Sequence, residues 1–192
     1  MTLADLLAAL TSGDDTRAEE AARRLPEYGQ PALDALQALL HTGAEDGRWW
    51  AVRALTEFPA GAEIRGSLLA ALEDESSDVR QAATLGLARH PAAEAIAPLA
   101  RALASREPLN AKLAANALIA LGAPAVPALL ETLENGSPAA RIEACRALAE
   151  IRDQRAIPAL MKAFQSDSAI LHYWAEQGLE KLGLNMIFMK PE

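Results

Sequence analysis

The 192-residue chain has little of what builds a β-sheet or a disulfide framework. It contains one cysteine, 3 valines and 8 isoleucines, and aromatic residues make up 4% of it. Strands favour β-branched and aromatic side chains, so this scarcity argues against sandwiches, barrels and parallel sheets. The single thiol, Cys145, excludes an internal disulfide and is typical of a protein from a reducing compartment.

Basic charge and long apolar runs are also scarce. The chain has 18 Lys and Arg against 26 Asp and Glu, which gives a net charge of −8. Nucleic-acid binding draws much of its strength from basic side chains, so a nucleic-acid partner is disfavoured. No apolar run approaches the ~18 residues of a membrane span, and residues 1–10 lack a basic signal region. We therefore expect a cytoplasmic protein without membrane contact.

Alanine and leucine dominate what is present. The sequence contains 44 Ala and 30 Leu, and these two residues stand near the top of the helix-propensity scale. Such a hydrophobic composition also argues against disorder. The chain is therefore predicted to be all-α.

A basic residue or histidine opens a helical pattern six times along the chain. The intervals are 31, 32, 32, 29 and 31 residues, and the positions are Arg17, Arg48, Arg80, Lys112, Arg141 and His172. A second helical stretch precedes each position, so each repeat is predicted to be a helix A, a polar turn and a helix B. A globular bundle that is merely rich in alanine would not need six units in phase. The expected repeats are residues 1–29, 30–61, 62–92, 93–122, 123–153 and 154–183, followed by a capping or dimer-forming tail, 184–192.

The repeat from Asp78 to Leu87, Asp-Val-Arg-Gln-Ala-Ala-Thr-Leu-Gly-Leu, resembles a HEAT repeat. The most similar variety is the short, phycobilisome-lyase-like HEAT repeat. This resemblance implies a right-handed α-solenoid in which the B helices line a concave binding surface. It also implies a ladder of bonds between repeats, formed by the turn Asp and the helix-B Arg. The residues that match this ladder are Asp46, Arg48, Asp78, Arg80 and Arg141, whereas Lys112 and His172 depart from it.

No arrangement of residues points to catalysis or to a metal. The histidines, His41, His90 and His172, fall in different repeats and have no zinc-binding spacing. Cys145 lies in the middle of a predicted helix B, where a lone cysteine is usually a small buried hydrophobic residue. We therefore expect no catalytic residue, no metal and no cofactor.

The scarce aromatics gather at two equivalent positions. Trp49 and Trp50 follow Arg48, and Tyr173 and Trp174 follow His172. Neighbours on a helix point about 100° apart, so one ring of each pair can pack inward while the other stays partly exposed. Exposed Trp and Tyr are favoured binding anchors.

These aromatics and the outward positions of the B helices define a predicted partner-binding face. Its members are Trp49, Trp50, Arg53, Gln81, Thr84, Leu113, Asn116, Ile142, Arg146, Tyr173, Trp174 and Gln177. The face would span several repeats, which suits a helix or an extended peptide. Residues 1–61 carry a net charge of −5, which favours a basic segment, although acidic solvated surface explains this charge equally well.

Three functions follow from the sequence. The first is a noncatalytic scaffold or adaptor, not an enzyme, which binds another protein and is a monomer or weak dimer. The second is a bilin lyase or tetrapyrrole carrier, a function that the resemblance includes. The third is a DNA glycosylase of HEAT-like fold, which the acidic composition disfavours. The scaffold is the expected function.

Overall fold

The computed structural model describes residues 1–184, which form helices and turns and contain no strand. Contacts divide the chain into two compact units, residues 1–91 and 92–192. The first is called the N-terminal unit, and the described part of the second, residues 92–184, is called the C-terminal unit. Residues 185–192, most of the expected capping tail, lie outside the described residues.

The N-terminal unit contains the first three predicted repeats, and each holds a helix A and a helix B. The helices A are α1 (Leu3–Leu10), α3 (Gln30–Thr42) and α5 (Ala62–Ala71). The helices B are α2 (Asp15–Arg24), α4 (Glu45–Leu55) and α6 (Ser77–Arg89), and the 3-10 turn η1 (Leu25–Tyr28) follows α2.

The C-terminal unit contains the other three repeats. The helices A are α7 (Ile96–Ala102), α9 (Val126–Asn135) and α11 (Ile157–Phe164), each preceded by a 3-10 turn, η2 (Ala93–Ala95), η3 (Ala123–Ala125) and η4 (Gln154–Ala156). The helices B are α8 (Pro108–Leu121), α10 (Pro138–Ile151) and α12 (Ala169–Lys181). The prediction of an all-α fold of HEAT-like helix pairs is confirmed over the described residues.

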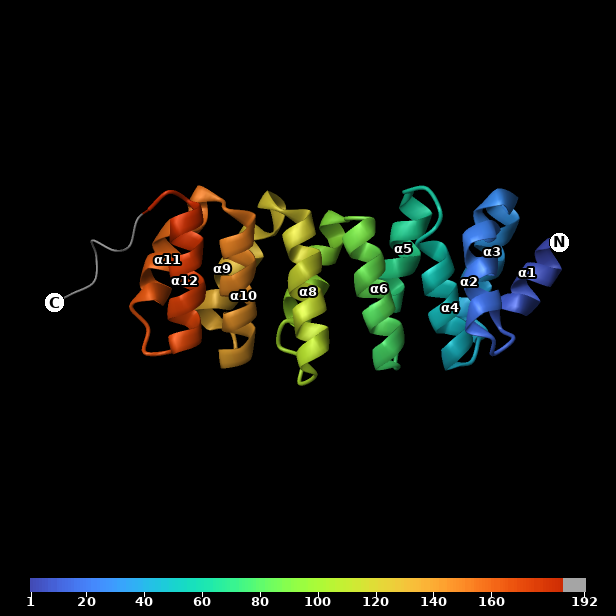
Figure 1. Cartoon of the computed structure of the whole chain (residues 1–192), viewed down its shortest axis with the longest axis horizontal. Coiled ribbons are helices and arrows are strands. Elements are labelled where there is room, and N and C mark those ends of the chain that lie inside the picture. Colours follow the sequence, from blue (N-terminus) through green and yellow to red (C-terminus); the bar gives the residue numbers. More distant parts are fainter. Residues whose placement is uncertain (185–192) are drawn as a thin grey trace. The chain divides into compact units, whose positions relative to one another are not determined.

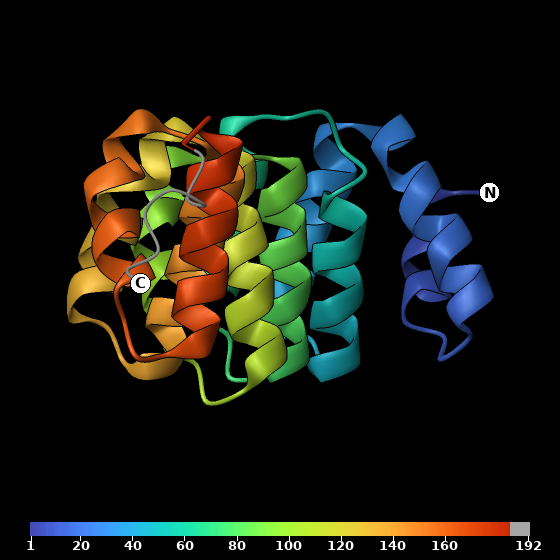
Figure 2. The same ribbon diagram turned by 60° about the vertical axis from the view of Figure 1, so that its left-hand side comes forward.

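Within each unit the B helices pack side by side in one layer. In the N-terminal unit α4 contacts both α2 and α6, and in the C-terminal unit α10 contacts both α8 and α12 (Figure 1). The A helices form the other layer of each unit (Figure 2). The B-helix face of each unit is therefore a continuous surface built from three helices.

Local sequence signals explain where the helices begin and end. Ser76 and Ser168 accept hydrogen bonds from backbone N–H groups in the first turns of α6 and α12, as N-cap residues do. Proline occupies the first turn of α9 and α11, where its missing N–H costs nothing. Gly122 ends α8 with φ of 70°, a conformation that L side chains rarely adopt. These signals recur because every repeat needs the same two turns.

Leucine and alanine divide the core between them. The largest fully buried side chains are all leucines, which fill the space between the two layers. Alanines of the B helices, such as Ala83, Ala115 and Ala144, are fully buried and let neighbouring helices approach closely. The alanine-rich composition therefore reflects the close spacing of the B-helix layer.

No single helix among residues 1–184 is long and apolar enough to cross a membrane. One pair, residues 108–121 and 123–135, reaches that length and composition only when taken together, and it is bent by 119°.

Candidate functional site

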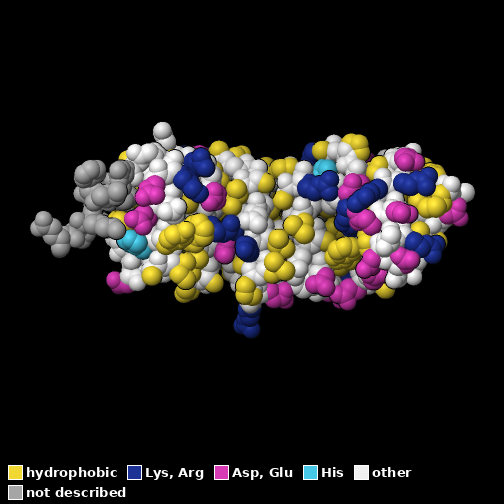
Figure 3. Space-filling model, viewed as in Figure 1, with side chains coloured by type: hydrophobic (Ala, Val, Ile, Leu, Met, Phe, Trp, Pro, Cys, Tyr) yellow, Lys and Arg dark blue, Asp and Glu magenta, His cyan; other side chains and the backbone are white. Residues whose placement is uncertain are grey.

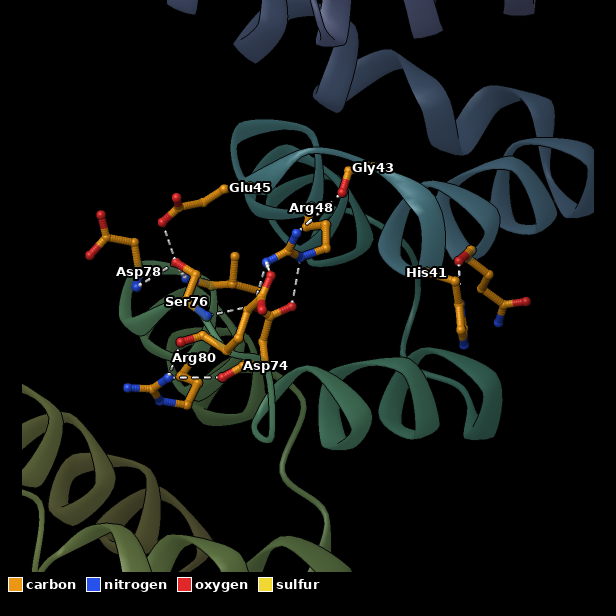
Figure 4. A network of polar contacts seen from close by, with 11 residues as sticks. His41, Gly43, Glu45, Arg48, Asp74, Ser76, Asp78 and Arg80 are labelled. Carbon is orange, nitrogen blue, oxygen red and sulfur yellow. Dashed lines mark hydrogen bonds and ion pairs between the residues drawn. The ribbon is translucent and has the colours of Figure 1, made fainter.

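At four of the six recurring positions, the basic residue or histidine of helix B bonds to a carbonyl group at the end of helix A, or in the turn after it, within its own repeat. The last carbonyl groups of a helix have no partner inside it, and a cation there also meets the negative end of the helix dipole. The pairs are Arg48 Nη1 with Gly43 O at 3.2 Å, Arg80 Nη1 with Asp74 O at 2.8 Å, Arg141 Nε with Leu133 O at 3.0 Å, and His172 Nδ1 with Phe164 O at 2.6 Å. In these four repeats the recurring residue thus closes the turn between helix A and helix B, as Figure 4 shows for Arg48 and Arg80.

A bond between repeats is present, but its acidic partner differs from the expected one. Arg48 Nε and Nη2 each donate to a carboxylate oxygen of Asp74 at 2.9 Å (Figure 4). This hydrogen bonding holds the pKa of Asp74 below its usual range. Asp46 and Asp78, the expected partners, are instead exposed in the first turns of α4 and α6. The ladder bond therefore starts from the turn before α6 rather than from its first turn.

Both aromatic pairs have one ring more exposed than the other. Trp49 and Trp50 meet edge to face, with centroids 4.8 Å apart, and Trp50 is buried at 5% exposure while Trp49 is half-buried. Tyr173 and Trp174 meet similarly at 5.1 Å, and Tyr173 is 51% exposed. Each repeat thus uses one ring to anchor the pair and presents the other on the B-helix face.

Trp49 stands between two hollows on the B-helix face of the N-terminal unit. The first, called the α4–α6 groove, has a volume of about 530 Å³, and its lining includes Trp49, Arg53, Asp78, Gln81, Leu85 and Arg89. The second, called the acidic hollow, has a volume of about 900 Å³ and is lined by Asp15, Glu19, Glu45, Asp46, Asp78 and Trp49. One aromatic ring therefore separates a groove containing two arginines from a hollow dominated by carboxylates.

A chain of ion pairs crosses this face near the C-terminal ends of the B helices. Arg53 donates to Glu19 at 2.6 Å and to Glu57 at 2.5 Å, and Arg89 donates to the same Glu57 oxygen at 3.2 Å. Burial alone would raise the pKa of Glu57, but its bonds with the two arginines outweigh burial and lower it. Figure 3 shows basic and acidic side chains interspersed in the upper part of this face and acidic side chains along its lower edge.

The C-terminal unit carries the remaining residues of the predicted face. Asn116 and Tyr173 are exposed, and the others, Leu113, Ile142, Arg146, Trp174 and Gln177, are half-buried. Arg146 joins α10 to α8, because its Nη1 donates to Asn116 Oδ1 at 3.0 Å. Arg146 and Asn116 therefore lie together on the B-helix layer, and the grouping of the other residues into one binding face stays a prediction.

Two residues of the predicted face are buried instead. Trp50 packs inward, and Thr84 is 6% exposed with its hydroxyl bonded to Arg80 O at 2.8 Å. Leu85, the next residue after Thr84, takes the outward position and is 53% exposed. The helix is rotated so that its small polar residue meets the neighbouring helix.

Sequence reasoning missed several exposed members of the face. Leu85 and Arg89 follow Gln81 at successive intervals of four, which is the spacing of one helix face. Leu109 and Ile170, both 53% exposed, precede Leu113 and Tyr173 by four and three residues. This helical spacing was the available signal.

A further groove, between α9 and α11 of the C-terminal unit, belongs to the A-helix layer. It has a volume of about 570 Å³ and is lined by Leu130, Glu134, Arg141, Arg155, Pro158 and Lys162, among others. Arg155 pairs with Asp153 at 2.7 Å, and Lys162 lies 3.7 Å from Glu134. This groove has no aromatic lining residue.

The cysteine and the histidines serve packing and hydrogen bonding. Cys145 is fully buried, and this burial raises the pKa of its thiol to about 12, so it is not a reactive thiolate. His90 is buried with Nε2 at 3.0 Å from Thr56 O, and His172 stacks on Phe164. Among residues 1–184, no group of three His, Cys, Asp or Glu side chains could hold a metal ion.

The chain is similar to two proteins whose names concern phycobilisomes or bilins. The chain is 40% identical over 106 residues to a phycobilisome maturation protein of Synechococcus elongatus, covering 54% of this chain and 50% of the relative. It is 39% identical over 92 residues to the bilin biosynthesis protein RpcF of Synechococcus sp. strain WH8020, covering 47% and 44%. The chain thus matches about half the length of these relatives.

A solved structure extends this similarity over nearly the whole chain. It is the complex of CpcE and CpcF of phycocyanin lyase from Nostoc sp. PCC7120, with 25% identity, a TM-score of 0.54, and coverage of 95% of this chain and 77% of that chain. The expectation of a noncatalytic scaffold is therefore wrong, and so is the expectation that the chain is not an enzyme. The repeat pattern misled because it encodes stacking between helices, which scaffolds and lyases share.

The repeats themselves define the family. A family model described as HEAT repeats matches residues 65–133 and 102–180, which together extend over more than half of the chain. The matched region runs from α5 in the N-terminal unit to α12 in the C-terminal unit. The resemblance to HEAT repeats of the phycobilisome-lyase type is confirmed, and the chain belongs to the HEAT-repeat family.

Proposed function

We propose that this chain is a subunit of a bilin lyase, an enzyme that acts on an open-chain tetrapyrrole and a phycobilisome protein. The observation that carries this proposal is the identity of about two residues in five to the phycobilisome maturation protein and RpcF. The similarity to a phycocyanin lyase chain supports it over most of the sequence. A tetrapyrrole carrier without transfer activity is the alternative.

The chain's own residues limit how it handles the bilin. Its single thiol, on Cys145, is fully buried and has a pKa raised to about 12. A buried thiol with a raised pKa is almost entirely protonated at neutral pH, and it is therefore a poor nucleophile toward the pigment. The bilin is therefore held noncovalently, and the chain acts by binding and orienting it.

A protein partner completes the enzyme in this proposal. The phycocyanin lyase structure is a complex of two chains. The B-helix face of the C-terminal unit supports such a contact, because Leu109, Ile170 and Tyr173 expose apolar surface there. Leu113, Asn116, Ile142, Arg146, Trp174 and Gln177 lie on the same face, and we assign them to it. The acidic hollow beside Trp49 favours a basic segment of a partner protein.

The free, buried Cys145 supports the cytoplasm as the location.

Bilin transfer tests the proposal. The chain would be purified with a second lyase subunit from the same organism and mixed with phycocyanobilin and the apo-phycobiliprotein. We expect covalently bound bilin on the acceptor, seen as fluorescence in a denaturing gel containing zinc, and none when this chain is omitted. Transfer that proceeds equally well without the chain would overturn the proposal. Bilin binding with no transfer under any condition would favour the carrier.

A further inference from the structure

We propose that the α4–α6 groove binds the open-chain tetrapyrrole, with Trp49 against a pyrrole ring and Arg89 on a propionate. This inference rests on the proposed function and names the place where the pigment sits. The groove has a volume of about 530 Å³, within the range of about 300–1,000 Å³ typical of small-molecule sites.

The apolar parts of the groove match a flat, conjugated ligand. Trp49 forms one wall, and its position is fixed by the edge-to-face contact with the buried Trp50. Leu85 lines the groove from α6 and is 53% exposed. Ala82 also lines the groove, and its small side chain leaves room for a ligand. An aromatic ring held in place by a second ring gives a stacking surface at little cost in side-chain entropy.

The two arginines have different roles. Arg53 is held by Glu19, Glu57 and Thr56, with contacts of 2.6, 2.5 and 3.1 Å. Arg89 is 58% exposed at its side chain and bonds to Glu57 at 3.2 Å. An exposed ion pair such as Arg89–Glu57 contributes little to the stability of the fold. A carboxylate of a ligand can therefore replace Glu57 as the partner of Arg89, or bind the same guanidinium together with Glu57. Arg89 is therefore the propionate-binding residue, and Arg53 positions Glu57 beside it.

The opposite end of the groove offers hydrogen-bond acceptors. Asp78 is exposed in the first turn of α6, and Gln81 lies one turn further along that helix. A bilin carries pyrrole N–H donors along its length and carboxylates on its propionate arms. The groove thus presents a carboxylate to the N–H groups and a guanidinium to a propionate, which fixes the direction of the pigment.

Two other hollows fit this ligand less well. The acidic hollow presents the carboxylates of Asp15, Glu19, Glu45, Asp46 and Asp78, which would repel propionates. The groove between α9 and α11 lacks an aromatic lining residue, and its Arg155 already makes a close pair with Asp153. Only the α4–α6 groove, among these three, combines an aromatic wall with an exposed arginine.

Titration of the full chain with biliverdin, followed by pigment absorbance and tryptophan quenching, tests the site. We expect Arg89→Gln and Trp49→Leu each to weaken binding by about tenfold, as loss of one charged bond or one stacking surface does. Trp49→Phe should restore most of the affinity, because it keeps a flat ring. The matched control is Arg65→Gln, on the helix-A layer of the same unit, which should leave affinity unchanged. Circular dichroism and urea midpoints establish that each variant is folded.

Biliverdin dimethyl ester isolates the role of the propionates. We expect the wild type to bind the ester more weakly than the acid, and Arg89→Gln to bind both equally. The proposal that this groove binds the pigment would be overturned if the wild-type chain did not bind biliverdin. It would also be overturned if Arg89→Gln and Arg65→Gln bound biliverdin with equal affinity. The bilin-transfer assay is read separately, so transfer that survives these variants would retain the lyase proposal while rejecting this site.

Discussion

Arg48 shows how one side chain can serve two repeats. It caps the end of α3 through Gly43 O and binds the carboxylate of Asp74, which follows α5 in the next repeat. The Arg48 and Asp74 side chains are only 13% and 11% exposed, so water has little access to this ion pair. The contact therefore links repeat stability to the charge state of a single carboxyl group.

Asp74→Asn should change how stability depends on pH. The Arg48 hydrogen bond lowers the pKa of Asp74 in the folded protein below its ordinary 3.8. A carboxyl of this kind stabilises the fold above its unfolded-state pKa, and the contribution is lost as the pH falls through the folded-state pKa. We expect the wild type to exceed the variant in free energy of unfolding above about pH 5 and the difference to shrink below about pH 4.

Urea unfolding, followed by circular dichroism from about pH 7 to about pH 3, measures this difference. Glu20→Gln, which removes an exposed carboxylate from α2, is the control. A stability difference for Asp74→Asn that stays constant over the whole range would show that Asp74 does not contribute through its charge.

At the scale of the helix, close approach within the B-helix layer depends on residues without a side chain. A Cβ atom added to Gly178 of α12 would lie 2.9 Å from Ala149 Cβ of α10 and 3.0 Å from Leu160 Cδ1 of α11. A Cβ atom added to Gly66 of α5 would have no other heavy atom within 4 Å. Both glycines therefore lie within helices, but only Gly178 is closely packed against neighbouring helices.

Alanine substitution should separate these two settings. Gly178→Ala should lower the free energy of unfolding by about 1–2 kcal/mol, because overpacking outweighs the gain in helix propensity. Gly66→Ala should raise it by about 0.5–1 kcal/mol through propensity alone. Urea denaturation measures both, and a stabilising Gly178→Ala would mean that α10 and α12 can separate without loss.

The helices were more predictable than the groove. The period of the basic residues and the alanine and leucine pattern predicted the helix pairs, because both arise from contacts that recur in every repeat. The groove depends on how far α6 is rotated against α4, which turns Thr84 inward and Leu85 outward. Likewise, turn geometry chooses Asp74 over Asp78 as the partner of Arg48. Rotation and turn geometry differ from one repeat to another, so a shared pattern does not encode them.

Over the whole molecule, charge is divided unequally between the two units. Residues 1–91 contain 8 Lys and Arg against 15 Asp and Glu, a net −7, whereas residues 92–192 contain 10 against 11, a net −1. Repulsion between like charges destabilises a compact state, and salt screens it. The N-terminal unit should therefore respond to salt more strongly than the C-terminal unit.

Tryptophan fluorescence can follow the units separately. Trp174→Phe leaves Trp49 and Trp50 to report on the N-terminal unit, and the double variant Trp49→Phe with Trp50→Phe leaves Trp174 to report on the C-terminal unit. Raising NaCl from about 0.01 M to about 0.3 M should increase the urea midpoint of the first signal more than that of the second. Equal shifts would contradict the expectation.

The capping of helix A by a basic residue of its own repeat has a consequence for how such chains change in length. A duplicated repeat brings both the carbonyl group and its donor, so the copy arrives with that contact already complete. Recombination could then alter the chain in steps of 29–32 residues, the spacing of the basic positions. The Arg48–Asp74 bond is different, because a repeat inserted after residue 61 would separate its two members. Copy number should therefore be constrained at this boundary, as at the others that a bond between repeats crosses, such as the one between Asn116 and Arg146.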